Sequence, residues 1–169
     1  MIRETARLGI AVWSCRILLL LSYALFWGGL TFYTGFVVRI AHDVLDNPMD
    51  GGLITQRVTA LLQMLGGVTV LLMLWNAFQV GLSNKRFGIA LTLCAIVLGV
   101  ALAGLVIVHG HLDAVIDIDA GEVVDRDAFT IGHRRYNQLT TVEWIATLCY
   151  LPITIAAWRR VDQAVANTV

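Results

Sequence analysis

Four long apolar segments constrain the fold of this chain more than any other feature of its sequence. They cover residues 17–38, 58–80, 87–108 and 139–158, and polar segments separate them. An α-helix needs about 20 apolar residues to cross the roughly 30 Å hydrocarbon core of a bilayer, and each segment is long enough. Because these segments mostly lack the polar stripe that a helix of a soluble bundle carries, they predict four membrane-spanning helices.

The overall composition agrees with this prediction. Hydrophobic residues make up 58% of the chain and charged residues 14%, and the mean hydropathy is +0.76. A soluble domain is usually about 45–50% apolar with about 25% charged residues. We therefore predict an all-α fold, an integral membrane antiparallel four-helix bundle, with residues 1–169 forming one four-span domain. The first segment is longer than the hydrophobic region of a signal peptide and lacks a cleavage site after it, so we expect it to be retained.

Charge is partitioned between the two ends of the predicted bundle, although the formal net charge is zero. The end that carries both termini is mainly basic, and it includes Lys85 and Arg86 in the short connection between spans two and three. The opposite end holds most of the acidic residues. Because short basic connections remain in the cytoplasm, we predict a multi-pass protein of the cell inner (cytoplasmic) membrane with cytoplasmic N- and C-termini.

Breaker residues predict where the spans begin and end. Residues 1–16 are expected to form a short amphipathic cytoplasmic lead before the first span. Asn47-Pro48 and the Gly51-Gly52 pair are expected to turn the chain between spans one and two. The connection around residues 83–85 is tight, which predicts an antiparallel hairpin of spans two and three. Small residues at Gly88, Thr92, Ala95, Gly99 and Ala103 form a stripe that favours close helix packing in the third span.

The longest connection is the outer loop of residues 109–138. It is compatible with a small β-hairpin around Ala120-Gly121, but we expect the third helix to continue to about Ile116 before a turn. Asp125 or Asp127 is expected to cap the fourth helix, because aspartate accepts hydrogen bonds from the free N–H groups of a first turn. Pro152 lies within the fourth span and is expected to bend it.

Polar residues recur at three- and four-residue spacing on one face of the fourth span, and a second polar face runs along the second span. Both faces begin at the outer end, so they are expected to meet in an outward-facing polar cleft. The candidate cleft residues are Glu143, Thr140, Thr147, Tyr150, Gln56, Gln63, Arg57 and Tyr33.

Glu143 is the residue of this set with two distinct interpretations. A carboxylate in a membrane span is costly, which favours a functional role such as binding a cation or passing a proton. Glu143 is also only about 6 Å along the helix from Leu139, where the span begins. At that depth Arg39, Arg57 or Arg135 could pair with it, and we favour this structural interpretation.

Histidines cluster at the outer ends of the predicted helices. His42, His109, His111 and His133, together with Asp113, are a candidate metal-binding set because imidazole and carboxylate groups bind zinc or copper. Residues two apart point to different sides of a helix, so the spacing is weak. Histidines from two helices would also suit haem, but no span carries a histidine near its centre. We therefore expect capping or interface histidines, and no cofactor.

Several function classes lack their usual sequence signals. The chain has no phosphate-binding glycine loop, no nucleophile elbow and no HExxH or CxxC motif, so we expect that it is not an enzyme. Nothing predicts nucleic-acid binding, and the lipid bilayer is the expected partner, with a homo-oligomer or a membrane partner subunit left open. We expect a structural or accessory membrane protein. A small transporter or metal-binding protein is the first alternative, and a haem-binding redox subunit is the second.

Short motifs along the chain resemble a known group. They are Trp27–Tyr33 (WGGLTFY), Thr55–Thr59 (TQRVT), the HLD triplet that begins at His111, the residues Phe129, His133, Arg134 and Tyr136, and the TVEW stretch that contains Glu143. Together they resemble a family of small uncharacterised bacterial four-span membrane proteins that is distantly similar to the transmembrane protein 205-like family. The resemblance implies a four-span protein without assigned enzymatic activity. Members of that family tend to have an amide at the position of Glu143, which argues against a proton relay there.

Overall fold

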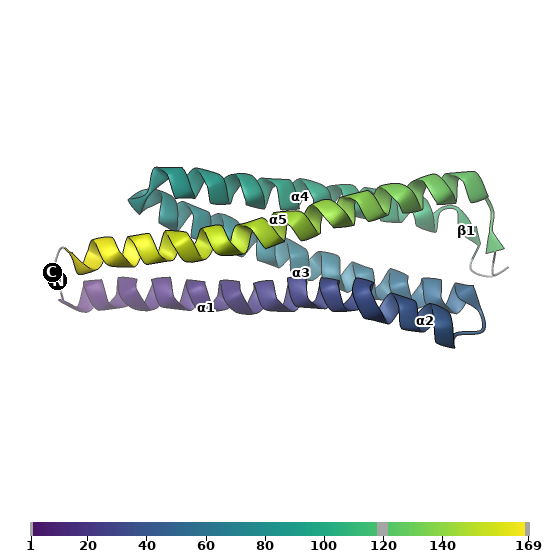
Figure 1. The fold of residues 1–169 in the computed structure, drawn as a ribbon, viewed down its shortest axis with the longest axis horizontal. Coiled ribbons are helices and arrows are strands. Elements are labelled where there is room, and N and C mark those ends of the chain that lie inside the picture. The colour runs from purple at the N-terminus through teal and green to yellow at the C-terminus, as the bar shows by residue number, and fades with distance from the viewer. Residues whose placement is uncertain (1, 118–121, 168–169) are drawn as a thin grey trace.

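The computed structural model describes residues 2–117 and 122–167 of the chain. Its elements, in chain order, are α1 (Ile2–Phe32), the π-helix η1 (Tyr33–Val37), α2 (Val38–Val44), α3 (Pro48–Ser83), α4 (Lys85–Asp113), β1 (Ile116–Asp117), β2 (Glu122–Val123) and α5 (Arg126–Ala166). Figure 1 shows long helices lying side by side, with the start of α1 and the end of α5 at the same end of the molecule. We call this the termini end, and we call the opposite end, which carries β1 and β2, the hairpin end.

Four helical segments are long and apolar enough to cross a membrane: Ile10–Val44, Asp50–Ser83, Lys85–Asp113 and Arg126–Ala164. Only 22% to 33% of the residues in their most apolar windows are buried inside the protein. Large side chains such as Leu71, Phe78 and Val100 are each more than 60% exposed. A protein in water would bury this surface, whereas the hydrocarbon of a bilayer solvates it. The all-α prediction with four long apolar helices is therefore confirmed.

The helices pack largely in chain order. α3 packs against α1 on one side and α4 on the other, and α4 also packs extensively against α5, while α5 has few contacts with α1 and α3. One core runs between them and includes the fully buried side chains of Phe26, Met73, Leu98 and Tyr150. Because α5 packs mostly against α4, the rest of its surface faces α1, α3 or the exterior.

Glycine permits the closest approach between α3 and α4. A Cβ atom added to Gly88 would lie 2.5 Å from the Cα atom of Gly81, on the other side of the tight connection. Of the predicted stripe on α4, Gly88 and Ala95 are buried and Ala103 is exposed. The expected small-residue packing is present in the first half of α4, just after the connection from α3, where the backbones of α3 and α4 are in contact.

Residues 2–16, expected to form a short amphipathic lead, are the first part of the continuous helix α1. One predicted detail of the connection between spans one and two is wrong. Gly51 and Gly52, expected to turn the chain, lie inside α3, which begins at Pro48. Proline suits the first turn of a helix, where its missing N–H group is not needed, so the turn ends earlier than the glycines suggested. The tight connection between spans two and three is confirmed, because α3 ends at Ser83 and α4 begins at Lys85.

The connection after α4 is a short β-hairpin rather than an extension of the helix. α4 ends at Asp113, so the expected continuation to Ile116 is wrong, and Ile116 instead pairs with Val123 across β1 and β2. The predicted turn at Ala120-Gly121 lies outside the described residues. The Oδ1 atom of Asp125 accepts hydrogen bonds from the backbone N–H groups of Asp127 and Ala128, which confirms the predicted cap of α5.

Candidate functional site

The polar faces of α3 and α5 meet toward the hairpin end. Tyr136 on α5 interacts with the side chains of Thr59 and Gln63 on α3, and it interacts electrostatically with Glu143 two turns further along α5 and with Tyr33 of η1. We call these five residues the Glu143 cluster. Its members come from three separate segments, so the fold gathers polar side chains that are up to 110 positions apart (143 minus 33).

A π-helical turn carries Tyr33 into this cluster. Tyr33 is the first residue of η1 and is 6% exposed, and its carbonyl oxygen accepts a hydrogen bond from the N–H group of Val38, five residues later. This wider turn shifts the register between α1 and α2. Turns of this kind are rare and recur at functional sites, because they redirect a side chain without ending the helix.

Glu143 is deeply buried and has no charged partner within the described part of the chain. Its side chain is 2% exposed, and its Oε1 atom has no hydrogen-bond partner. Arg39, Arg57 and Arg135 are all exposed, and the ion pairs recorded among the described residues join other side chains. The ion pair that we favoured from the sequence is therefore not formed. A bare buried carboxylate is costly, so the group must carry a proton or meet a ligand.

Two N–H donors in the same part of the bundle are also unpaired. The Nε1 atom of Trp27 and the Nε2 atom of Gln63 are buried without a hydrogen-bond partner. Trp27 packs between Tyr23 and Trp144, with ring centroids 6.0 Å apart in both pairs. Trp144 follows Glu143 in the chain, so the indole of Trp27 lies at the level of the cluster. Buried polar atoms are nearly always paired, and unpaired ones of this kind indicate water or a ligand.

A second polar network lies nearer the termini end and is joined by a chain of hydrogen bonds, although the Oγ1 atom of the neighbouring buried Thr154 has no partner. The Nε1 atom of Trp158 donates to the Oδ1 atom of Asn76 at 2.8 Å, and the Nδ2 atom of Asn76 donates to the hydroxyl oxygen of Tyr150 at 2.9 Å. The Tyr150 hydroxyl in turn donates to the carbonyl oxygen of Met73 at 2.9 Å. Each of these groups has a partner, so this network joins α3 to α5 as a structural contact.

The remaining predicted cleft residues lie around these two features rather than in one open cleft. Thr147 is fully buried, and its hydroxyl donates to the carbonyl oxygen of Glu143 at 2.8 Å. Thr140 is half-buried and donates to the carbonyl oxygen of Tyr136 at 3.0 Å. Gln56 is half-buried, whereas Arg57 is exposed. The structure thus brings Glu143, Gln63 and Tyr33 together but places Tyr150 and Arg57 elsewhere.

Three site residues were missed in the sequence. From the sequence, Trp27 beside close-packing glycines could line a ligand groove, but helix packing is the favoured interpretation, and no pattern in its own helix indicates an unpaired indole N–H group. Asn76 lies 13 residues beyond Gln63, which is about three and a half helical turns, so it falls on a different side of α3 and the polar face of Gln63 does not lead to it. Trp158 is its partner across the bundle, and a pairing of this kind is visible only in three dimensions.

The histidines do not form the predicted metal set. His109 lies beside Asp113, with Nε2 and Oδ2 3.6 Å apart, while His133 stacks on Phe129 at 5.9 Å. The Nδ1 atom of His42 lies 2.7 Å from the carbonyl oxygen of Val38, and His111 is exposed. Across residues 2–117 and 122–167, no three histidine, cysteine or acidic side chains lie close enough to hold a metal ion.

Comparison of the chain with protein-family models, with curated proteins and with solved structures gives no match. The resemblance to the transmembrane protein 205-like family therefore stays a prediction. The functional interpretation that follows depends on the geometry of the Glu143 cluster.

Proposed function

We propose that this chain is a multi-pass integral membrane protein that moves protons through Glu143, as a small proton-coupled transporter. The observation that supports this proposal is the buried Glu143 carboxyl group, whose Oε1 atom has no hydrogen-bond partner. Tyr136, which interacts electrostatically with Glu143, links it to polar side chains of α3 and η1. An acidic side chain inside a membrane span is a candidate relay when no basic residue neutralises it. The structural or accessory role expected from the sequence would call for a carboxyl group with a partner.

The atoms around Glu143 favour a proton over a metal cation. Sodium or calcium requires several oxygen ligands, whereas the other unpaired polar atoms in this part of the bundle are the N–H groups of Trp27 and Gln63, which donate hydrogen bonds and repel cations. Donors of this kind suit a water molecule or a carboxylate.

The orientation that we propose places the hairpin end outside the cell and the termini end in the cytoplasm of a bacterial inner membrane. The support for this orientation is the positive charge of Lys85 and Arg86 at the tight connection, which lies at the termini end. Glu143 then lies closer to the outer surface, so protons would reach it from outside.

The decisive experiment measures proton flux into liposomes that contain the purified protein and a trapped pH-sensitive dye. We expect flux above that of empty liposomes for the wild type and none for Glu143→Gln, because an amide keeps the shape of the side chain but exchanges no proton. The matched control is Glu122→Gln, the same substitution on the exposed strand β2, and it should leave flux unchanged. Wild-type flux equal to that of empty liposomes, or equal flux in Glu143→Gln, would refute the proposal.

Chemical labelling gives an independent readout of the same group. A lipid-soluble carbodiimide reacts with protonated carboxyl groups in apolar surroundings, and mass spectrometry locates the adduct. We expect the adduct on Glu143 and not on the exposed Asp162 of the same helix. An unlabelled Glu143 would show that the carboxyl group is either ionised or out of reach from the bilayer.

A further inference from the structure

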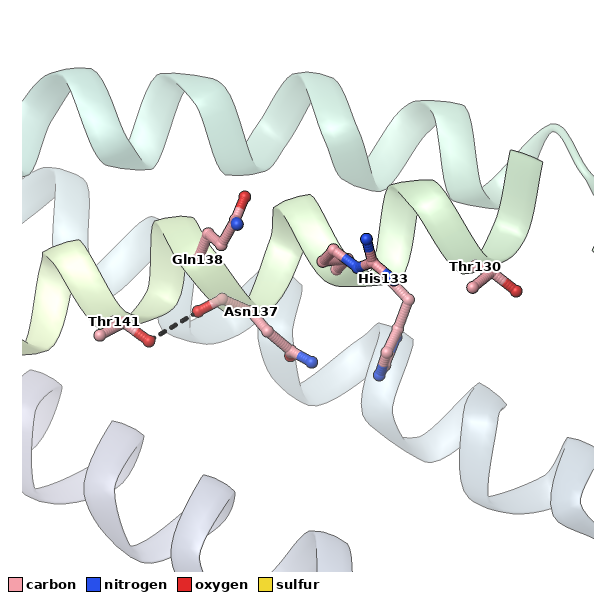
Figure 2. Close-up of a pocket in the computed structure, with 6 residues that line it drawn as sticks. Thr130, His133, Asn137, Gln138 and Thr141 are labelled. Carbon is pink, nitrogen blue, oxygen red and sulfur yellow. Dashed lines mark hydrogen bonds between the residues drawn. The ribbon is translucent and has the colours of Figure 1, made fainter. Parts of the chain in front are cut away.

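A separate surface pocket lies on α5 toward the hairpin end, outside the Glu143 cluster (Figure 2). Its volume is about 440 Å³, and six polar residues of α5 line it: Thr130, His133, Arg134, Asn137, Gln138 and Thr141. All six are exposed. Figure 2 shows the side chains of Asn137 and Gln138 projecting to different sides of the helix, and the Thr141 hydroxyl donating to the carbonyl oxygen of Asn137 at 2.8 Å.

The charge of this pocket is positive, although acidic residues dominate the rest of the hairpin end. Arg134 and His133 are its basic side chains, and none of the six lining residues is acidic. Neither residue takes part in the ion pairs recorded within the described ranges. The guanidinium of arginine presents several N–H donors in a planar fork that matches two phosphate oxygens. The amide of Asn137, three residues further along α5, adds another donor.

The surface beside the pocket changes from polar to apolar within one helical turn. Trp144, Ile145 and Leu148 follow Thr141 by three, four and seven residues, which places them on the same side of α5. They are 37%, 51% and 44% exposed. Thr141 and Trp144 are about 4.5 Å apart along the helix axis, and tryptophan favours the boundary between headgroups and hydrocarbon.

We propose that this pocket binds the phosphate of an anionic phospholipid, with Arg134 as the main contact and the acyl chains along Ile145 and Leu148. The pocket supplies positive charge and N–H donors at the headgroup level, and the apolar surface begins where the acyl chains begin. This site is separate from Glu143, so it stands whether or not the protein carries protons. The helix α5 has few contacts with α1 and α3. The bound lipid would therefore fix the depth of its exposed part in the membrane.

The test is native mass spectrometry of the delipidated full-length protein in detergent, titrated with phosphatidylglycerol, with phosphatidylcholine and with inorganic phosphate. We expect phosphatidylglycerol to bind at least several-fold more tightly than phosphatidylcholine. Arg134→Gln should weaken phosphatidylglycerol binding about tenfold, because one charge-assisted contact is lost. Arg134→Lys should bind phosphatidylglycerol more weakly than the wild type but more tightly than Arg134→Gln, since lysine keeps the charge but lacks the planar fork.

The matched control is Arg126→Gln, which removes the same charge from the same helix at a position about two turns from Arg134 that does not line the pocket. It should bind phosphatidylglycerol as the wild type does, and circular dichroism should show each variant folded. If Arg134→Gln does not fold, Asn137→Ala provides the second variant, with a smaller loss. Equal binding by wild type and the pocket variants would overturn the proposal. So would displacement of the lipid by an equal concentration of inorganic phosphate, which would indicate a site for soluble anions.

Discussion

The contact between Gly81 and Gly88 gives the sharpest prediction about stability. Replacing Gly88 with alanine would place a methyl group 2.5 Å from the Cα atom of Gly81 and 3.2 Å from the carbonyl oxygen of Ala77. Both neighbours are backbone atoms of α3, so no side-chain rotation relieves the clash. Carbon atoms pack at about 3.5–4.0 Å, so α3 and α4 must separate by about 1–1.5 Å beside their tight connection.

The expected loss of stability follows from two opposing effects. Overpacking a tight interface costs about 1–3 kcal/mol, and a contact with backbone belongs near the upper part of that range. Alanine favours the helical conformation over glycine by about 1 kcal/mol, which offsets part of the cost. We therefore expect Gly88→Ala to lower the free energy of unfolding by about 1–2 kcal/mol. For a chain of this length, that loss corresponds to a fall in Tm of about 2–8 °C.

Gly67→Ala is the matched control, because a Cβ atom at Gly67 meets nothing within 4 Å. It should keep or raise the Tm, since it has the helix-forming benefit without the clash. Thermal unfolding of both variants is followed by circular dichroism in the same detergent. A Gly88→Ala protein that melts at or above the wild-type temperature would refute the close approach of α3 and α4.

Two further predictions concern the contacts that join α5 to the rest of the bundle. Asn76→Leu leaves the buried Trp158 N–H group and the Tyr150 hydroxyl without one partner each, so it should cost about 2–4 kcal/mol in detergent unfolding. A stability equal to the wild type would show that the network is not structural. Arg16 pairs with Asp162 at 2.8 Å, but the Asp162 side chain is 59% exposed. A double-mutant cycle with alanine at both positions should give a coupling below about 1 kcal/mol that falls as salt is added, and a larger salt-independent coupling would contradict this.

The helical part of the fold could be predicted from the sequence because the signal is local. Each apolar segment is long enough to span a bilayer on its own, and lipid leaves few alternatives to a helix for such a segment. The tight connection at Asn84 and the cap at Asp125 also depend on a few adjacent residues. These features need no knowledge of distant contacts, and the structure contains them.

The errors occur where two local signals compete. The Gly51-Gly52 pair resembles a break, but Pro48 at the start of α3 sets the helix boundary, and the following glycines continue it. Ile116 is apolar like the residues of α4, and this favoured a longer helix. In the structure Ile116 pairs with Val123 and belongs to β1 instead. That pairing satisfies the backbone through residues that follow a turn, so a helical pattern cannot reveal it.

The surroundings of Glu143 could be predicted only in part. Helical spacing placed Glu143 and Gln63 on the polar faces of their helices, but it does not specify which side chains meet across the bundle. Arg57 shares the second span with Gln63, and sequence distance alone made it a plausible partner. In the structure Arg57 is exposed while Gln63 is half-buried, because six residues of helix, at about 100° each, turn their side chains about 120° apart.

The two polar groups that α3 and α5 share differ in a way that burial alone does not explain. Asn76 and Glu143 are 3% and 2% exposed, and both lie on helices that face lipid elsewhere. Every polar atom around Asn76 that joins it to Trp158 and Tyr150 has a partner, so that network needs nothing more from outside the chain. At Glu143 the Oε1 atom is unpaired, and the N–H groups of Trp27 and Gln63 in the same part of the bundle are unpaired too. If both groups served packing, hydrocarbon side chains would serve it better at Glu143, where an unpaired polar atom costs several kcal/mol. This cost, kept at one position of an otherwise apolar span, supports the proposal that Glu143 exchanges a proton.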